Sequence, residues 1–186
     1  MREFDDSPPA LAGSLLIAHP NLLDPNFRRT VLLIAANDSD EGSFGFVLNR
    51  PTGKTVRDFI DADELGPLSD LPVYIGGPVG VEQLTFASIA WTGAEEGIEC
   101  DPNLSIEDAR EMAIVRAGEL RAFIGYAGWG KGQLEAELAQ KAWMLQRAEE
   151  QFLAAHEAEE MWRASLRKIG PWFRLLAAAP DDPSRN

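Results

Sequence analysis

The feature that most constrains this sequence is a series of short apolar runs, each bounded by glycine, proline, asparagine or aspartate. Runs of this length, rich in β-branched, leucine and aromatic residues, are typical of strands. The sequence therefore predicts strands at residues 14–18, 30–36, 44–48, 72–75, 84–90 and 121–126. Residues 37–42 are rich in turn formers and predict a hairpin. The alternation of Asp38 and Asp40 also suits calcium, but the other ligand positions of a calcium loop are missing, so we favour the turn.

Two hydroxyl residues mark helix starts. Thr55 precedes Asp58 at the spacing of a capping box, and the same pattern begins at Ser105. At this spacing a hydroxyl and a carboxylate exchange hydrogen bonds with free backbone N–H groups. We expect a short helix after Thr55 and a longer one that runs toward Gly118, where glycine would provide a left-handed stop.

Residues 133–168 consist mainly of helix formers, yet a single helix there would far exceed the average of about 11 to 12 residues. Trp143 and Leu145 alternate with their neighbours as strand residues do. We therefore divide the segment into a helix at 133–140, a strand at 142–147 and a helix at 157–168. Trp162 and Trp172 could anchor an interface or cover the core, and we favour the core.

Strands joined by hairpins and interspersed with helices predict an α+β fold with a mixed, mostly antiparallel sheet and packed helices. No internal repeat or linker divides the chain, so we expect one domain over residues 11–176. Residues 1–10 and 177–186 contain acidic residues and prolines and are expected to be flexible ends.

The chain carries 30 Asp and Glu against 17 Lys and Arg, a formal net charge of −13 that is spread over both halves. Because nucleic-acid affinity depends on Lys and Arg contacts with phosphates, this balance disfavours direct nucleic-acid binding. The basic candidates are short: Arg28 with Arg29, and Arg163 with Arg167 and Lys168.

Other features predict a cytoplasmic protein. No apolar run is long enough for a membrane span, and the N-terminal residues lack the pattern of a signal peptide. The one cysteine, Cys100, has no internal partner for a disulfide, which suits a reducing compartment.

The glycine-rich segment 128–132 lies between a predicted strand and a predicted helix, where backbone N–H groups can bind an anion. Glu135 and Glu137 fall in the first turns of that helix and would repel a phosphate. We therefore favour a structural turn anchored by a packed Trp129 over a ligand site.

Asn49 and Arg50 follow another predicted strand. Arg50 offers a planar fork of donors and Asn49 both donates and accepts, which suits a carboxylate, an amide or a phosphate. An ordinary loop at Pro51 is equally compatible. Gly76 and Gly77 permit close backbone approach, which tight sheet geometry also explains.

The sequence contains few histidine and cysteine residues that could act as a catalytic base or nucleophile. His19 and His156 alone supply imidazole; His19 could act as a base or cap a turn, and His156 lies among acidic residues typical of a solvated face. Acidic neighbours disfavour a thiolate at Cys100. We expect no catalytic set, no metal site and no cofactor.

Ordered blocks of the sequence form a combined pattern: residues 11–20 (LAGSLLIAHP), 24–31 (DPNFRRTV), 45–51 (GFVLNRP), 72–79 (PVYIGGPV) and 125–138 (GYAGWGKGQLEAEL). With these blocks the chain resembles the bacterial YqgE/AlgH family over about residues 11–170. The resemblance implies a sheet curved into a partly open barrel, and it favours the strand at Trp143. That family is largely uncharacterised, its label of transcriptional regulator comes from one member's genetic association, and it offers no established catalytic residues.

The motif positions of this resemblance define a candidate ligand groove. Its residues are Asn49, Arg50, Gly76, Gly77, Tyr126, Trp129, Gln133 and Glu135. The leading hypothesis is a regulatory or adaptor domain that contacts an unknown protein or small-molecule partner through this groove.

Two other functions compete with it. One is a hydrolase or transferase in which Glu135 acts as general base and Arg50 stabilises developing negative charge. The other is transcriptional regulation by direct DNA contact through Arg163, Arg167 and Lys168, which the net charge disfavours. The sequence leaves the oligomeric state open.

Overall fold

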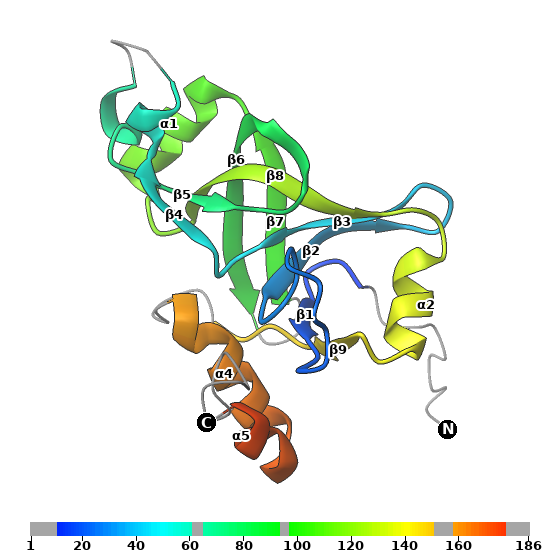
Figure 1. Cartoon of the computed structure of the whole chain (residues 1–186). Coiled ribbons are helices and arrows are strands. Elements are labelled where there is room, and N and C mark those ends of the chain that lie inside the picture. The colour runs from blue at the N-terminus through cyan, green and yellow to red at the C-terminus, as the bar shows by residue number, and fades with distance from the viewer. Residues whose placement is uncertain (1–10, 61–64, 94–96, 151–157, 178–186) are drawn as a thin grey trace, which may run out of the picture.

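A computed structural model of the chain describes residues 11–60, 65–93, 97–150 and 158–177 (Figure 1). Its strands are β1 (Leu15–Ala18), β2 (Val31–Asp38), β3 (Gly42–Val47), β4 (Pro51–Thr55), β5 (Pro72–Ile75), β6 (Val79–Gly93), β7 (Gly97–Leu104), β8 (Leu120–Trp129) and β9 (Trp143–Gln146). Its helices are α1 (Ile106–Val115), α2 (Gln133–Ala139), α4 (Ala158–Ile169) and α5 (Pro171–Ala177), with 3-10 turns η1 (Val56–Asp58) and η2 (Gly66–Leu68). The expected α+β class is confirmed.

The strands form one mixed sheet in the order β4-β5-β8-β3-β2-β1-β9, which β6 joins by pairing with both β7 and β8. β5 pairs with β8 in parallel, and the other described strand pairs are antiparallel. The sheet curls into a half-barrel, with α1 at one end and α4 and α5 at the opposite end beside β1 (Figure 1). The expected mixed, mostly antiparallel and partly open barrel is therefore confirmed.

The larger core cluster lies under β1, β2 and β3. All four residues of β1 are buried, which explains why its sequence is a continuous apolar run without alternation. Phe46 stacks on Phe123 at the centre of this cluster, with ring centroids 4.4 Å apart. A second cluster, which includes Val56, Leu68 and Val73, lies against α1.

The predicted helix starts are confirmed, but one predicted helix end is wrong. The Ser105 hydroxyl accepts from the Asp108 N–H at 3.1 Å, and Thr55 opens a capping box at η1. α1 ends at Val115 because the following residues close a separate turn. In that turn the Glu119 N–H donates to the Arg116 carbonyl oxygen at 3.0 Å, and Gly118 is not left-handed.

The division of residues 133–168 into helix, strand and helix is also confirmed, by α2, β9 and α4. The strands β4 and β7 were not predicted from the sequence. Among the described strands, β4 pairs only with β5, and β7 pairs only with β6. Edge strands tolerate proline and glycine and need no continuous apolar run, so β4 and β7 have the composition of loops.

The prediction that both tryptophans cover the core is correct for Trp162, which is 2% exposed, and wrong for Trp172, which is 67% exposed. Trp172 belongs to α5, a short helix that packs on α4 at the outside of the half-barrel. None of the described helices is long and apolar enough to cross a lipid bilayer.

The crowding of β3 against β2 generates a test of the sheet. A Cβ on Gly45 would lie 2.0 Å from the Leu33 carbonyl oxygen, so Gly45→Ala must displace a strand in the middle of the sheet. We expect it to lower the free energy of unfolding by about 1 to 3 kcal/mol or more. Gly118→Ala is the control, because a Cβ there meets nothing within 4 Å and should change stability by less than about 0.5 kcal/mol. Urea unfolding followed by circular dichroism measures both, and equal stabilities would contradict the described packing.

Candidate functional site

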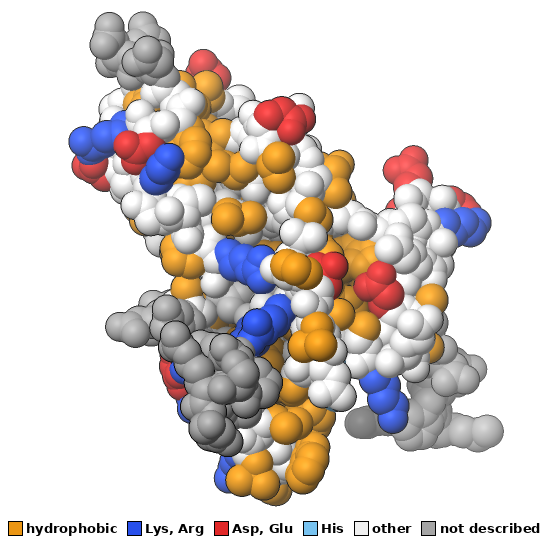
Figure 2. Space-filling view, in the orientation of Figure 1, with side chains coloured by type: hydrophobic (Ala, Val, Ile, Leu, Met, Phe, Trp, Pro, Cys, Tyr) orange, Lys and Arg blue, Asp and Glu red, His pale blue; other side chains and the backbone are white. Residues whose placement is uncertain are grey.

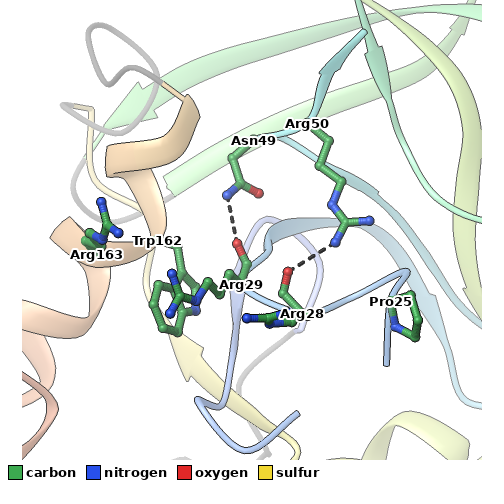
Figure 3. Close-up of a pocket in the computed structure, with 7 residues that line it drawn as sticks. All are labelled: Pro25, Arg28, Arg29, Asn49, Arg50, Trp162 and Arg163. Atoms are coloured by element: carbon green, nitrogen blue, oxygen red, sulfur yellow. Dashed lines mark hydrogen bonds between the residues drawn. The ribbon is translucent and has the colours of Figure 1, made fainter. Parts of the chain in front are cut away.

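A cavity of about 470 Å³ opens between the turn at residues 24–29, the β3–β4 connection and α4 (Figure 3). Its described lining residues are Pro25, Arg28, Arg29, Asn49, Arg50, Trp162 and Arg163. Four of these are arginines and none is acidic, in a chain whose net charge is −13. We call this the arginine cavity.

The turn at residues 24–29 is closed by local hydrogen bonds. The Asp24 carboxylate accepts from the Asn26 N–H at 2.8 Å. The Asp24 carbonyl oxygen accepts from the N–H groups of Phe27 and Arg28 at 3.0 and 2.7 Å. Arg29 then takes a left-handed backbone conformation with φ of 57°, which is uncommon for a residue with a Cβ. The turn thus presents two consecutive arginines in a conformation that needs support from other parts of the chain. We call residues 24–29 the arginine turn.

Asn49 provides that support from the β3–β4 connection. Its Oδ1 accepts from the Val31 N–H at 2.8 Å, and its Nδ2 donates to the Arg29 carbonyl oxygen at 3.0 Å. One amide therefore fixes both the start of β2 and the left-handed arginine before it. Asn49 is a positioning residue for the turn as well as a lining residue of the cavity.

Arg50 is half-buried, and its Nη2 donates to the Arg28 carbonyl oxygen at 3.1 Å. Burial lowers the pKa of the Arg50 guanidinium, and the nearby Asp24 carboxylate opposes that shift. Burial also lowers the pKa of Arg29, and the like charges of Arg28 and Arg163 lower it further. Arginine stays protonated at neutral pH, so the cavity concentrates positive charge that a bound anion would offset.

Trp162 lines the cavity next to Arg29 and connects α4 to the sheet. Its Nε1 donates to the Ala18 carbonyl oxygen at 2.8 Å. The Arg29 guanidinium carbon lies 5.2 Å from the centre of the Trp162 ring, within cation–π range. Figure 3 shows Arg29 over this ring, with Arg163 on the same helix as Trp162. The position of α4 is thus tied to the arginine turn.

Arg50 also lines a second, smaller cavity of about 100 Å³. Its described lining residues are Asn26, Val47, Arg50, Ile75, Gly77, Pro78 and Val81. We call this the apolar cavity, because its walls are mainly aliphatic.

Gly76 and Gly77 bring the chain at this cavity close to β8. A Cβ on Gly77 would lie 2.2 Å from the Tyr126 carbonyl carbon, and one on Gly76 would lie 2.3 Å from the Gly125 carbonyl oxygen. Tight sheet geometry, the simpler of the two interpretations of these glycines, accounts for both. Their part at the site is to shape the backbone of the apolar cavity.

Trp129 and Gln133 belong to a network around Glu137, away from the arginine lining. Glu137 Oε2 accepts from Trp129 Nε1 at 3.0 Å and from Trp143 Nε1 at 2.8 Å. Gln133 Nε2 donates to Glu137 Oε1 at 3.0 Å. Trp129 is 5% exposed, so it is packed as expected for the anchor of a structural turn. Glu135, on the same helix, is exposed and does not line the arginine cavity.

Phe27 connects this network to the arginine turn. Its ring stacks on Trp129 with centroids 6.4 Å apart and meets Trp143 edge to face at 5.4 Å. The indoles held by Glu137 therefore support the segment that presents Arg28 and Arg29.

The structure thus divides the residues of the candidate groove. Asn49 and Arg50 share the arginine cavity, and Gly77 lines the adjoining apolar cavity. Tyr126 lines a third cavity of about 430 Å³, together with Phe44 and Gln83 among others.

Arg28, Arg29, Arg163 and Trp162 were not predicted at the site. The sequence signal for the first two is a basic pair directly before a predicted strand in an acidic chain. The sequence also shows Arg163 as a basic residue, grouped with Arg167 and Lys168, but its place at this cavity depends on where α4 packs.

The remaining sequence candidates have structural explanations. His19 Nδ1 accepts from the Asn21 N–H at 3.2 Å, so His19 caps a turn, and His156 lies outside the described residues. Asp38 Oδ1 accepts from the N–H groups of Asp40 and Glu41, as expected for the hairpin turn. The described part of the chain contains no cluster of three or more metal-ligating side chains.

Cys100 is half-buried on β7, and burial, with a smaller contribution from Asp101, raises the pKa of its thiol to about 12. The reactive form is the thiolate, so folded protein should react with iodoacetamide at pH 8 at least about a hundredfold more slowly than denatured chain, whose thiol pKa is near 8.5. Mass spectrometry of the alkylated protein measures both rates. Similar rates would mean that the thiol is not protected in this way.

The network around Glu137 provides a second test with a neighbouring control. Glu137→Ala leaves the indole N–H groups of Trp129 and Trp143 without their acceptor, so we expect a loss of roughly 2 kcal/mol or more in unfolding free energy. Glu135→Ala removes the same charge from an exposed position of α2 and should cost less than about 0.5 kcal/mol. Denaturant titration of both variants checks this difference, which would vanish if the network did not form.

Comparisons with known proteins agree with this architecture. A family model described as AlgH-like matches residues 15–174. A UPF0301 protein of Chlorobaculum tepidum is 37% identical over 182 residues, which cover 94% of this chain and 95% of that relative. The crystal structure of a Corynebacterium diphtheriae protein shares the fold, with a TM-score of 0.71 at 22% identity over 95% of both chains. The solution structure of the AlgH protein from Pseudomonas aeruginosa has a TM-score of 0.68 at 29% identity, covering 98% of this chain and 100% of that one. The chain therefore belongs to the AlgH-like family, which includes these UPF0301 proteins.

Proposed function

We propose that this protein is a regulatory domain that binds a small phosphate or carboxylate anion in the arginine cavity. The observation that carries the proposal is the gathering of Arg28, Arg29, Arg50 and Arg163 around one cavity of a chain with net charge −13. Guanidinium groups donate paired hydrogen bonds to carboxylate and phosphate oxygens, so several of them around one space favour such a ligand.

The residue types at the cavity support binding over catalysis. Its described lining contains no serine, threonine, cysteine, histidine, lysine or carboxylate that could act as nucleophile or general base. Glu135, the base of the hydrolase or transferase hypothesis, lies on α2 outside this lining. An arginine and asparagine lining can hold an anion without transforming it.

The surroundings support a small anion over DNA. Two basic residues of α4 outside the cavity lining form ion pairs: Arg167 pairs with Glu160, and Lys168 Nζ lies 2.9 Å from a Glu149 carboxylate oxygen. A DNA backbone needs an extended basic surface, whereas a small anion needs only the cavity itself.

A ligand in this cavity has a route to regulation. Arg163 lies on α4, Arg50 on the β3–β4 connection and Arg28 on the arginine turn, so one anion can contact elements that are distant in the sequence. If the anion binds best when α4 is docked, it stabilises that arrangement by its differential affinity. The docked state of α4 is then the quantity that the ligand controls.

Calorimetric titration with pyrophosphate and citrate at physiological salt tests the proposal. We expect saturable binding that Arg163→Gln weakens about tenfold to a hundredfold, because each charge-assisted contact contributes about 1.5 to 3 kcal/mol. Arg116→Gln is the matched control, since Arg116 is an exposed arginine that pairs with Glu119 and does not belong to the described lining of the cavity, so its substitution should leave affinity within about twofold.

Each alternative has its own outcome. Absence of saturable heat with either anion, or equal weakening by both variants, contradicts anion binding in this cavity. Binding of a short DNA duplex that is tighter than that of either small anion at the same salt would favour the regulator-by-DNA-contact hypothesis instead.

A further inference from the structure

The two cavities that share Arg50 as a lining residue point to a more specific ligand. The arginine cavity supplies cationic donors, whereas the apolar cavity beside it is walled mainly by Val47, Ile75, Pro78 and Val81. We propose that the anion carries a short alkyl substituent, with its charged head in the arginine cavity and its alkyl chain in the apolar cavity. This inference rests on the proposed function and names its ligand class, an alkyl phosphate or an alkyl carboxylate.

Arg50 is positioned to contact both parts of such a ligand. Its guanidinium is fixed toward the arginine turn by the hydrogen bond to the Arg28 carbonyl oxygen, as Figure 3 shows. Its backbone is fixed to β5, because the Ile75 N–H donates to the Arg50 carbonyl oxygen at 2.8 Å. An arginine side chain has an apolar stem and a charged head, so one residue can line an apolar and a charged space at once.

Aliphatic side chains at the apolar cavity remain exposed to solvent. Ile75 is 41% and Val81 54% exposed, although both are large apolar residues beside a charged site. Figure 2 shows basic side chains near the middle of this face with hydrophobic side chains next to them. An alkyl chain that covers Ile75 and Val81 would remove their apolar surface from water, which favours binding.

The size of the apolar cavity limits the alkyl chain. At about 100 Å³ it is far smaller than the arginine cavity at about 470 Å³. A chain of a few carbons fills it, and further methylene groups would extend into solvent. Affinity should therefore rise over the first carbons of a homologous series and then level off.

The test is a calorimetric titration of the full chain with two series: methyl to hexyl phosphate, and acetate to heptanoate. We expect each methylene group that enters the cavity to tighten binding about fourfold, followed by a plateau. The series with the tighter short member identifies the head group as phosphate or carboxylate, and a rising slope in either one supports the proposal.

Val81→Asn separates the alkyl contribution from the charged one. It replaces an exposed aliphatic wall with a polar side chain of similar size, so methyl phosphate should bind as to the unmodified chain, whereas butyl phosphate loses most of its added affinity. Val115→Asn on α1 is the matched control, because Val115 is also an exposed valine and does not belong to the described lining of either cavity. Circular dichroism confirms that both variants are folded.

These titrations distinguish failure of the alkyl proposal from failure of anion binding itself. If inorganic phosphate and methyl phosphate bind but affinity does not change with chain length, the alkyl proposal is overturned and anion binding stands. If no member of either series binds, and pyrophosphate and citrate do not bind either, the proposed function fails as well. A slope that persists in Val81→Asn places the alkyl chain elsewhere and also overturns the proposal.

Discussion

The fold and the site depend on the way β8 changes partners along its length. Its first part pairs with β5 in parallel and with β6 in antiparallel fashion, and its end pairs with β3. This change bends the sheet and requires Gly76 and Gly77 to pack against the β8 backbone with no room for a Cβ. Two hydrogen bonds connect this bent region to the site. The Val47 N–H donates to the Gly76 carbonyl oxygen, and the Ile75 N–H donates to the Arg50 carbonyl oxygen. The curl of the sheet thereby fixes the backbone of Arg50, the residue that lines both cavities.

Several of the motif residues do not line the arginine cavity and instead support the residues that would contact a ligand. Glu137 holds the indoles of Trp129 and Trp143, and these pack on Phe27 in the arginine turn. From the other side, Asn49 holds the backbone of the turn where it takes its left-handed conformation. Guanidinium groups that repel one another need such external restraint, because without it they would separate into solvent. A glycine-rich segment that resembles an anion loop can therefore serve an anion site indirectly, by packing.

The sequence predicted what local chemistry determines. Apolar runs indicated β1, β2, β3 and β5, and the hydroxyl caps indicated the start of α1, because these signals lie within a few residues. The edge strands β4 and β7 escaped prediction, since pairing on one side imposes little on composition. At the site, Asn49 and Arg50 were predictable as a polar pair after a strand. Arg163 was not, because its contribution depends on Trp162 docking α4 onto β1, a contact between distant parts of the chain.

The whole chain is negatively charged, whereas the described lining of the arginine cavity is positively charged, and this difference affects which anions could bind there. Exposed charges are screened beyond about 8 Å at physiological salt, so the overall excess of acidic residues weakly affects an anion small enough to enter the cavity. A long polyanion must instead lie across the acidic surface outside it, where repulsion accumulates with every phosphate. Within the cavity, the guanidinium of Arg29 lies over the Trp162 ring, where burial strengthens its attraction for an oxyanion. Under the proposed function, a concentrated cationic cavity within an acidic chain would therefore select by size as well as by charge, and would favour compact anions over nucleic acids.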